Sequence, residues 1–492
     1  MIPRWSAALA AGLLVLVSLG RAAGAAEPGD KCYACHTEAG TPEAAAYKTD
    51  VHFANGVSCA DCHGGDRTSE DQDAAMDKKK GFIGVPAKAD IPKVCGKCHG
   101  PGDNPYKRQY HLDDVRSAFE GSAHGQALDQ SDAGPQCVSC HGIHSIAPVK
   151  DPRSSVHPLK VAKTCAKCHS NAAYMRDFNP RLPVDQYEKY LTSQHGKLNS
   201  SGDPKPATCV SCHGNHAVLQ VKDPRAPVYL TKVPGTCGHC HSDARYMAQY
   251  HIPTDQYEGY KQSAHGVALL KNSDLNAPAC NSCHGNHGAA PPGSNSVAAV
   301  CGTCHQANAE LFDKSPHRKV FEHDKLPGCV TCHGNHRVVP PTDALVSFDK
   351  PSPCAKCHQN APSDTSAASI RRIRGVLDSL SLGKDDAVQV LNHAEQLGMD
   401  VSEARYSLKD VNQAVVQSRV AVHAFRAAAL VEAARPGLEV IAKARKAGDD
   451  AVHEYRFRRQ GLVISTLIVT ALVILLYLKI RQIERRQRNE SS

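Results

Sequence analysis

The sequence predicts a mainly α-helical protein with extensive loops, in which a long first part is followed by a helical bundle and one C-terminal transmembrane helix. Three observations lead to this prediction. The 492 residues include 22 Cys and 28 His but only 5% aromatic residues, too few large apolar side chains for a conventional core. Apolar residues recur at helical spacing after residue 360. An uncharged apolar run near the C-terminus is long enough to cross a bilayer.

The N-terminus predicts a signal peptide. An apolar run from about Ala7 to Leu19 is followed by Gly24, Ala25 and Ala26, the kind of small residues at which signal peptidases cleave. We therefore expect residues 1–26 to be removed, and the chain that follows to be exported across a membrane.

The next part of the chain contains every Cys, and each one belongs to a Cys-x-x-Cys-His unit. No Cys is left over. The eleven units are Cys32/Cys35/His36, Cys59/Cys62/His63, Cys95/Cys98/His99, Cys137/Cys140/His141, Cys165/Cys168/His169, Cys209/Cys212/His213, Cys237/Cys240/His241, Cys280/Cys283/His284, Cys301/Cys304/His305, Cys329/Cys332/His333 and Cys354/Cys357/His358.

This motif predicts covalently attached haem c. Two thiols three residues apart reach both vinyl groups of a haem, and the adjoining His ligates the iron as the proximal ligand. Zinc ribbons pair their Cys units and give no reason for a recurring His, thioredoxin-like sites occur once, and disulfides between such close Cys would close tiny loops. We expect eleven haems c in an undecahaem cytochrome domain, residues 27–360, where porphyrin faces replace the missing hydrophobic core.

Internal repeats in this domain predict the second, distal iron ligand. The element CHGIH or CHGNH recurs and places a further His three residues after the proximal one. A second element, Ser-x-His, recurs between these copies, and His52 resembles a degenerate form of it. The nine predicted distal ligands are His52, His124, His144, His195, His216, His265, His287, His317 and His336. We expect mostly bis-His haems of low potential.

Two distal positions have no assigned ligand. In the first CHGGD motif, Asp66 occupies the place that holds a distal His in the later copies. Met is a poor alternative, because few Met are present. The competing residues are His111, His157, His239, His251, His323 and His423.

On the CHGNH and Ser-x-His-Gly elements, residues 27–360 resemble the doubled-CXXCH multihaem cytochromes of anaerobic respiring bacteria. The resemblance implies electron transport through closely spaced bis-His haems, usually in the periplasm. Ammonia-forming nitrite reductases carry one Cys-x-x-Cys-Lys site with an open iron. This sequence has no such unit, which weakens a nitrite reductase interpretation.

Residues 361–460 predict a periplasmic helical bundle that acts as a stalk or docking platform. Breaks near Gly383, Gly398 and Pro436 suggest about four antiparallel helices, with Ser402 as an N-cap and Pro436 in a first helical turn. Three His lie in this segment, and His423, in an Ala/Val-rich stretch, is the one to test as a haem ligand.

Residues 461–478 predict a transmembrane helix, and residues 479–492 a basic tail in the cytoplasm. Five cationic residues follow the apolar run and three precede it. Because the more positive flank of a membrane span usually lies in the cytoplasm, we expect the tail to be cytoplasmic. This orientation agrees with an exported N-terminal part, which would stand in the periplasm on a bacterial inner membrane.

The formal net charge of +8, taken alone, would be compatible with a nucleic-acid partner. Removing the signal peptide and counting two ionised propionates on each of eleven ferric haems changes the net charge to about −5, because cofactor charges belong in the total. Nucleic acid is therefore not an expected partner.

The expected function is electron transfer between an inner-membrane quinol-oxidising complex and periplasmic or outer-membrane acceptors in anaerobic respiration. A single span without an intramembrane His argues for a separate membrane subunit that oxidises the quinol. The alternative is a terminal reductase of a small nitrogen or sulfur oxyanion at one haem with an open distal face. The sequence favours an electron carrier over a catalyst and leaves both open.

Overall fold

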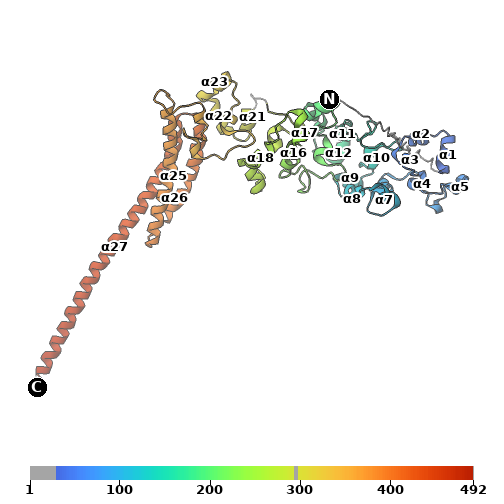
Figure 1. The fold of residues 1–492 in the computed structure, drawn as a ribbon. Coiled ribbons are helices and arrows are strands. Elements are labelled where there is room, and N and C mark those ends of the chain that lie inside the picture. Colours follow the sequence, from blue (N-terminus) through green and yellow to red (C-terminus); the bar gives the residue numbers. More distant parts are fainter. Residues whose placement is uncertain (1–28, 293–296, 491–492) are drawn as a thin grey trace, which may run out of the picture. The chain divides into compact units, whose positions relative to one another are not determined.

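The computed structural model describes residues 29–292 and 297–490. The predicted signal peptide lies outside these ranges. The described residues are mainly helical with extensive loops and contain no strand, as the sequence predicts. Figure 1 shows short helices along most of the chain and long ones near the C-terminus.

Contacts within the chain divide it into two units. One consists of the described residues up to Cys237 together with Gly285–Ala290, and the other of Gly238–His284 together with the residues from Pro291 onward. The Cys-rich segment therefore contributes to both units, and its last part groups with the helical bundle.

The first unit is built from short helices joined by loops. They are α1 (Lys31–Glu38), α2 (Pro42–Tyr47), α3 (Val51–Ala54), α4 (Cys59–His63), α5 (Gln72–Ala75), η1 (Lys78–Lys80), η2 (Lys88–Asp90), α6 (Ile91–His99), α7 (Pro105–Tyr110), α8 (Val115–Glu120), α9 (Ala123–Gln130), α10 (Cys137–His141), α11 (Val161–His169), α12 (Ala172–Phe178), α13 (Gln186–Thr192), α14 (Gln194–Ser200) and α15 (Cys209–His213). Helix α16 (Val233–His241) runs through the division between the units.

The second unit also begins with short helices joined by loops, and it ends in long helices. Its short elements are α17 (Ala244–Met247), η3 (Ala248–Tyr250), α18 (Gln256–Lys261), α19 (Ala264–Gly266), η4 (Val267–Lys271), α20 (Cys280–His284), α21 (Val297–Gly302), α22 (Gln306–Asp313), α23 (Pro316–His323), α24 (Cys329–His333), η5 (Asp343–Leu345) and η6 (Cys354–Lys356). Its last elements are α25 (Ala367–Gln396), α26 (Ser402–Ala421), η7 (Val422–Ala424) and α27 (Ala427–Glu490).

Five copies of the Cys motif are called the CHG copies here: CHGGD at His63 and the CHGIH or CHGNH elements at His141, His213, His284 and His333. Each forms a five-residue helix that ends just before the glycine. The copy at His99 also has a glycine after its His but is not one of them, because its helix has nine residues and Gly100 has a φ of −118°. The helices of the five CHG copies are α4, α10, α15, α20 and α24. The glycine that follows has a φ of 70° at Gly64 and 82° at Gly142, and similar positive values in the other copies. An L side chain rarely adopts this conformation, so glycine ends the helix and turns the chain sharply toward the residues that follow.

The Ser-x-His element begins a helix, and its serine is the N-cap. Ser122, Ser193 and Ser263 are almost fully buried, and each hydroxyl accepts a hydrogen bond from the N–H of the glycine three residues later. The serine thereby satisfies one of the free donors of the first turn. Asp50 has the same role before His52, which explains why this copy lacks the serine.

The glycine after these His residues allows a close approach of two backbone segments. A Cβ atom at Gly196 would lie 1.9 Å from the carbonyl oxygen of Tyr190, and one at Gly266 would lie 1.9 Å from that of Tyr260. No side chain fits there. The Ser-x-His-Gly pattern is thus a local folding signal that positions the His.

A repeated backbone hydrogen bond joins the two kinds of element. The residue between the N-cap and the His donates to a carbonyl two residues after the His of a later CHGIH or CHGNH copy. The four bonds are Val51 N to Ile146 O at 2.8 Å, Ala123 N to Val218 O at 2.8 Å, Gln194 N to Ala289 O at 3.1 Å and Ala264 N to Val338 O at 2.9 Å. Each ties together segments far apart in sequence.

The bundle contains three helices, and the prediction of about four is wrong. Only Gly398, with a φ of 79°, lies in a turn. Gly383 lies inside α25, where a Cβ would come within 3.2 Å of Ile441, so it permits close packing and breaks no helix. Pro436 lies inside α27 at an exposed position and not in a first turn. Glu432, whose carbonyl would accept the N–H that proline lacks, is also an exposed residue.

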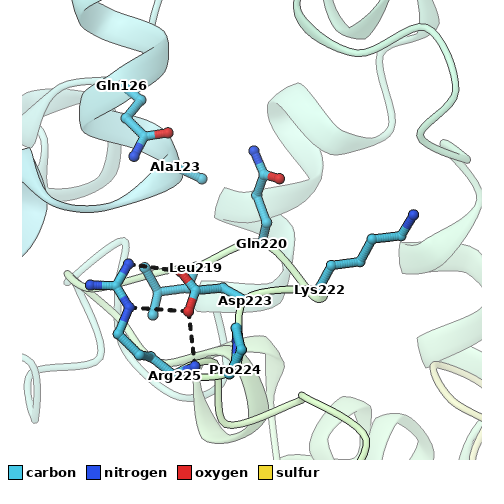
Figure 2. Close-up of a pocket in the computed structure, with 8 residues that line it drawn as sticks. All are labelled: Ala123, Gln126, Leu219, Gln220, Lys222, Asp223, Pro224 and Arg225. Atoms are coloured by element: carbon cyan, nitrogen blue, oxygen red, sulfur yellow. Dashed lines mark hydrogen bonds and ion pairs between the residues drawn. The ribbon is translucent and has the colours of Figure 1, made fainter. Parts of the chain in front are cut away.

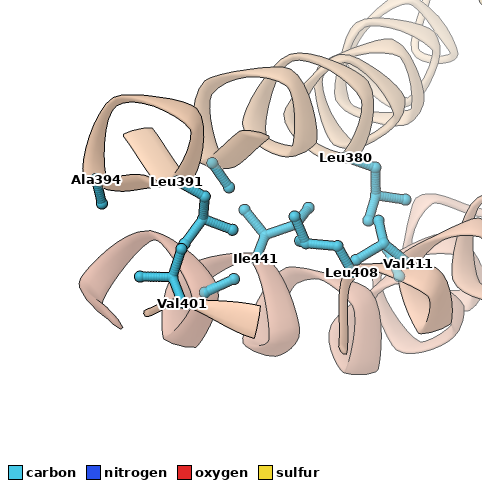
Figure 3. Packing of buried hydrophobic residues seen from close by; sticks show 10 residues of the cluster. Leu380, Leu391, Ala394, Val401, Leu408, Val411 and Ile441 are labelled. Atoms are coloured by element: carbon cyan, nitrogen blue, oxygen red, sulfur yellow. The ribbon is translucent and has the colours of Figure 1, made fainter. Parts of the chain in front are cut away.

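Helices α25 and α26 pack along the first part of α27 around an apolar core. Leu380, Leu391 and Val411 are completely buried in it (Figure 3). The prediction of Ser402 as an N-cap is wrong, because Val401 is the N-cap and Ser402 is the first residue of helix α26. The N–H and the hydroxyl of Ser402 donate hydrogen bonds to Asp400. These three helices form a conventional hydrophobic core of their own.

Helix α27 continues beyond the bundle into the apolar run. Among the described helices it is the one long and apolar enough to span a membrane, judged by length and composition. Its large side chains from Leu462 to Leu478 are exposed. Figure 1 shows this part of the helix extending past α25 and α26.

Candidate functional site

The Cys-x-x-Cys-His motif brings its three side chains to one side of a short helix in nine of the eleven copies. In α10, Cys137 opens the helix, and Cys140 and His141 follow at its end. Residues three apart on a helix share a face, which places the two thiols side by side. The Cys side chains are partly or fully exposed, so they are accessible for covalent attachment.

The copies at Cys301 and Cys354 depart from this geometry. Helix α21 ends at Gly302, so that Cys304 follows the helix in a turn, and η6 ends one residue before Cys357. Backbone hydrogen bonds of 2.9 Å still close both turns, from the N–H of His305 to the carbonyl of Cys301 and from that of His358 to the carbonyl of Cys354. The two thiols of each copy therefore stay neighbours without a regular helix.

Thioether formation at the individual thiols stays a prediction. The second thiols of four motifs, Cys168, Cys212, Cys240 and Cys304, illustrate the exposure that attachment needs. The first three are partly exposed and Cys304 is exposed, with the hydroxyl of Thr303 3.9 Å from its Sγ. Burial, together with a contact to Cys168, raises the pKa of Tyr174 to about 12. Exposure keeps these thiols accessible to a haem vinyl group.

Outside the five CHG copies, four proximal His lie opposite the His of a Ser-x-His element or of its degenerate form at His52. The ring centres are 6.2 Å apart for His99 and His52, and 6.1 Å for His169 and His124. Two further pairs of this kind are His305 with His265 at 6.1 Å and His358 with His317 at 5.9 Å.

The proximal His of a CHG motif lies opposite the distal-type His of the next CHG copy along the chain. The four pairs are His63 with His144 at 6.0 Å, His141 with His216 at 6.1 Å, His213 with His287 at 6.1 Å and His284 with His336 at 5.9 Å. A ninth proximal ring, that of His333, lies 6.0 Å from His423 of η7. We call these nine the imidazole pairs.

The spacing of the imidazole pairs fits an iron atom between the two rings. A metal–imidazole bond of about 2 Å on each side, plus about 1 Å from each ligating nitrogen to its ring centre, separates two ring centres by about 6 Å. Aromatic rings in direct contact also have centres about 4.5–7 Å apart, but direct contact does not require such a narrow spread. The residues present therefore fit haem with two axial His.

Burial favours the neutral form of most of these rings, which a metal ligand requires. Burial lowers the pKa of His124 to about 4, with a smaller contribution from His169. Burial is also the main cause that lowers the pKa of His99, His141, His144, His169, His213, His216, His265, His287, His317, His333, His336 and His423. A neutral imidazole presents one nitrogen lone pair to a metal.

Hydrogen bonds to Nδ1 orient several rings and leave Nε2 for the metal. His52 Nδ1 lies 2.8 Å from the buried carboxylate of Asp50, and His63 Nδ1 lies 2.7 Å from the carbonyl oxygen of Gly84. His358 Nδ1 lies 2.6 Å from the hydroxyl of Ser366. Such outer partners fix the tautomer and the orientation of a ligating His.

Successive motifs lie close together. The thiols of Cys95 and Cys137 are in hydrogen-bonding contact, which together with burial raises the pKa of Cys95. Cys165 and Cys209 make the same contact, as do Cys301 and Cys329. The attachment points of neighbouring motifs are therefore within van der Waals reach, as closely spaced redox centres require.

Eight of the nine predicted distal residues lie opposite a proximal His, and the ligation of His195 and His241 stays a prediction. Among the competing residues, His423 takes such a position. No proximal ring lies against the other competitors among the described residues: His111, His157, His239, His251 and His323. His323 instead pairs with Asp324 at 2.7 Å.

The first motif differs from the others. The side chain of His36 is exposed, and among the described residues no second imidazole lies against it. Asp66, which stands where later copies have a distal His, bonds Lys80 at 2.8 Å and the hydroxyl of Thr68 at 2.7 Å. These hydrogen bonds hold the pKa of Asp66 well below its usual range.

A hollow next to His124, which pairs with His169, contains no catalytic group. Ala123 and Gln126 of α9 face the loop that carries Lys222, Asp223 and Arg225 (Figure 2). The Arg225 guanidinium, 2.7 Å from Asp223, is the main cause that lowers the pKa of this carboxyl to about 2. The hollow is lined by an ion pair and amide side chains, which suit a solvated surface.

Comparison with known protein families gives two matches. The model for cytochrome c3 matches residues 51–170, and the model for cytochrome c554 and c-prime matches residues 19–64. No curated protein and no solved structure matches the chain.

Proposed function

We propose that the chain is a multihaem c-type cytochrome that conducts electrons in the periplasm between a quinol-oxidising complex of the inner membrane and periplasmic or outer-membrane acceptors in anaerobic respiration. The observation that carries this proposal is the series of imidazole pairs at 5.9 to 6.2 Å. Two axial His leave an iron no open position for substrate, so these sites suit electron transfer.

In this proposal each of the eleven Cys-x-x-Cys-His units holds one haem through two thioether bonds. The bound haem supplies one-electron redox chemistry. The protein supplies two axial nitrogens at most sites, buries their rings, and holds neighbouring attachment points together. The contact between Cys95 and Cys137 is an example of such spacing.

We further propose that residues 1–26 direct export and that residues 461–478 anchor the protein in the inner membrane. The exposed apolar side chains of this part of α27 support the anchor. The basic residues after residue 478 support a cytoplasmic tail.

The length of α27 bears on the partner. From Ala427 to residue 461 the helix is continuous, which corresponds to about 51 Å at 1.5 Å per residue. With α27 upright, the imidazole pairs next to η7 stand far above the membrane surface. The membrane partner must then carry its own redox centre to that height, and a quinol within the bilayer would not reduce this chain directly.

Haem counting and spectroscopy test the proposal on the purified full-length protein. Pyridine haemochrome analysis and the intact mass should give eleven haems per chain, and the ferric spectra should be dominated by low-spin centres. A haem count far below eleven, or mostly high-spin iron, would contradict a bis-His electron conduit.

A second function is favoured by one observation. His36 has no second imidazole against it among the described residues, so a haem at Cys32 and Cys35 would present an open face. Such a site would suit a terminal reductase of a small nitrogen or sulfur oxyanion. A high-spin ferric signal that shifts on addition of nitrite or cyanide, and that disappears when Cys32 and Cys35 are replaced by Ala, would support it. Electron transfer remains the only function if every ferric centre is low-spin.

A further inference from the structure

The CHG motifs follow a pairing rule along the chain. The proximal His of each copy faces the His that stands three residues after the proximal His of the next copy. His63 faces His144, and the rule continues through His284, which faces His336. The rule also explains Asp66: there is no earlier CHG motif for a His at that position to serve.

The last copy, with proximal His333, has no later CHG motif to face. In its place the turn η7 between α26 and α27 presents His423, whose ring centre lies 6.0 Å from that of His333 at an interplanar angle of 25°. The distance and the near-parallel rings match the other CHG pairs, whose angles range from 11° to 30°.

The surroundings of His423 hold its ring in the orientation of a ligand. Nδ1 lies 3.0 Å from the carbonyl oxygen of Val420, which can only accept a hydrogen bond, and 3.1 Å from the side-chain amide nitrogen of Asn308. A proton on Nδ1, which the contact with Val420 favours, leaves the lone pair on Nε2 that a metal ligand needs.

The same turn touches a second imidazole pair. Phe425, in the left-handed conformation with a φ of 50°, packs on the ring of His317 with 4.0 Å between the centres. His317 in turn faces His358. Arg419, one turn before η7, forms an ion pair with Asp343 at 2.9 Å. Asp343 begins η5, so this ion pair links the segment after the last CHG motif to helix α26 of the bundle.

We propose that His423 is the distal ligand of the iron bound at Cys329, Cys332 and His333. The helical bundle, which carries the membrane anchor, thereby completes the C-terminal end of the haem series through an Nε2–iron bond. The haem at Cys329 and Cys332 and the haem at Cys354 and Cys357 are then the two that lie against the helical bundle, whose helix α27 continues into the proposed membrane anchor. This inference rests on the proposed haem content and adds a ligand that no repeat supplies.

The test replaces His423 by Ala in the full-length holoprotein. The haem count should stay at eleven, while one ferric haem per chain changes from low-spin to high-spin. The reduced protein should bind one more equivalent of carbon monoxide than the parent, and added imidazole should restore the low-spin spectrum. His393, exposed on α25 of the same bundle, gives the matched control, and His393→Ala should leave the spectra unchanged.

A packing role for His423 predicts a different result. In that case His423→Ala would weaken the bundle without creating a high-spin haem, and the proposal would be overturned. His423→Met guards against a folding defect, because a thioether retains an axial ligand and should raise the potential of one haem while keeping it low-spin. A low haem count in the parent protein would count against the proposed function itself, so the two failures are distinguishable.

Discussion

Replacing Gly437 by Ala should loosen the three-helix bundle. A Cβ at this position of α27 would lie 2.5 Å from Ala414 Cβ and 3.0 Å from Leu380 Cδ2, distances that force the helices apart. Overpacking of this kind costs about 1–3 kcal/mol. Gly375 on α25 is the matched control, because its Cβ would meet no atom within 4 Å.

At both positions Ala gains about 1 kcal/mol of helix propensity over Gly. Gly375→Ala should therefore stabilise the bundle, and Gly437→Ala should destabilise it by about 1 kcal/mol after this gain is subtracted. The two variants should differ by about 2 kcal/mol, or about 30-fold in the opening equilibrium. Hydrogen exchange of bundle peptides in the detergent-solubilised holoprotein measures this difference without interference from haem absorption. Equal exchange in the two variants would refute the packing that we describe between α25, α26 and α27.

Three further outcomes are expected. Gly266→Ala should displace helix α19 and its His, because the added Cβ would lie 1.9 Å from the carbonyl oxygen of Tyr260; a shifted midpoint potential or spin state of one haem checks this. The pKa of Asp343 is held low chiefly by Arg419, so their contact contributes stability above the ordinary carboxyl pKa and loses it as the pH falls through the lowered value. Hydrogen exchange around η5 and at the end of α26 should therefore rise in acid, and Arg419→Ala should remove most of that pH dependence. Protein made without haem attachment should be degraded rapidly by protease within residues 27–360, and a compact, resistant apoprotein would contradict the role of haem as the interior of this domain.

The attachment motifs could be predicted from the sequence because covalent attachment and proximal ligation depend on neighbouring residues. The distal residues were recognisable for a related reason. A Ser N-cap before the His and a Gly after it are local requirements of one helical turn, and they recur wherever that turn recurs. Eight of the nine predicted distal rings accordingly lie opposite a proximal His. The aromatic residue three positions before each N-cap, such as Phe119 or Tyr190, belongs to the same signal, since its carbonyl accepts from the serine.

Other features depended on contacts between distant residues. Gly383 and Pro436 resemble helix breaks in sequence, but Gly383 faces Ile441 and Pro436 faces solvent, so both lie inside helices. The Ala/Val-rich stretch around His423 distinguished it from His393, but the sequence did not indicate its partner, because His333 lies far away in sequence. Long-range pairing of this kind leaves no periodic trace within the segment that contains the residue.

The sequence by itself determined the helical fold class, the Cys-x-x-Cys-His units and the turns that carry most of the predicted distal histidines, because each depends on interactions within a few residues. Only the tertiary structure decided which imidazole faces which, that the bundle has three helices, and that η7 lies against the last CHG motif. These features depend on the close packing of segments separated by tens of residues, where the approach of two surfaces and not local propensity sets the geometry.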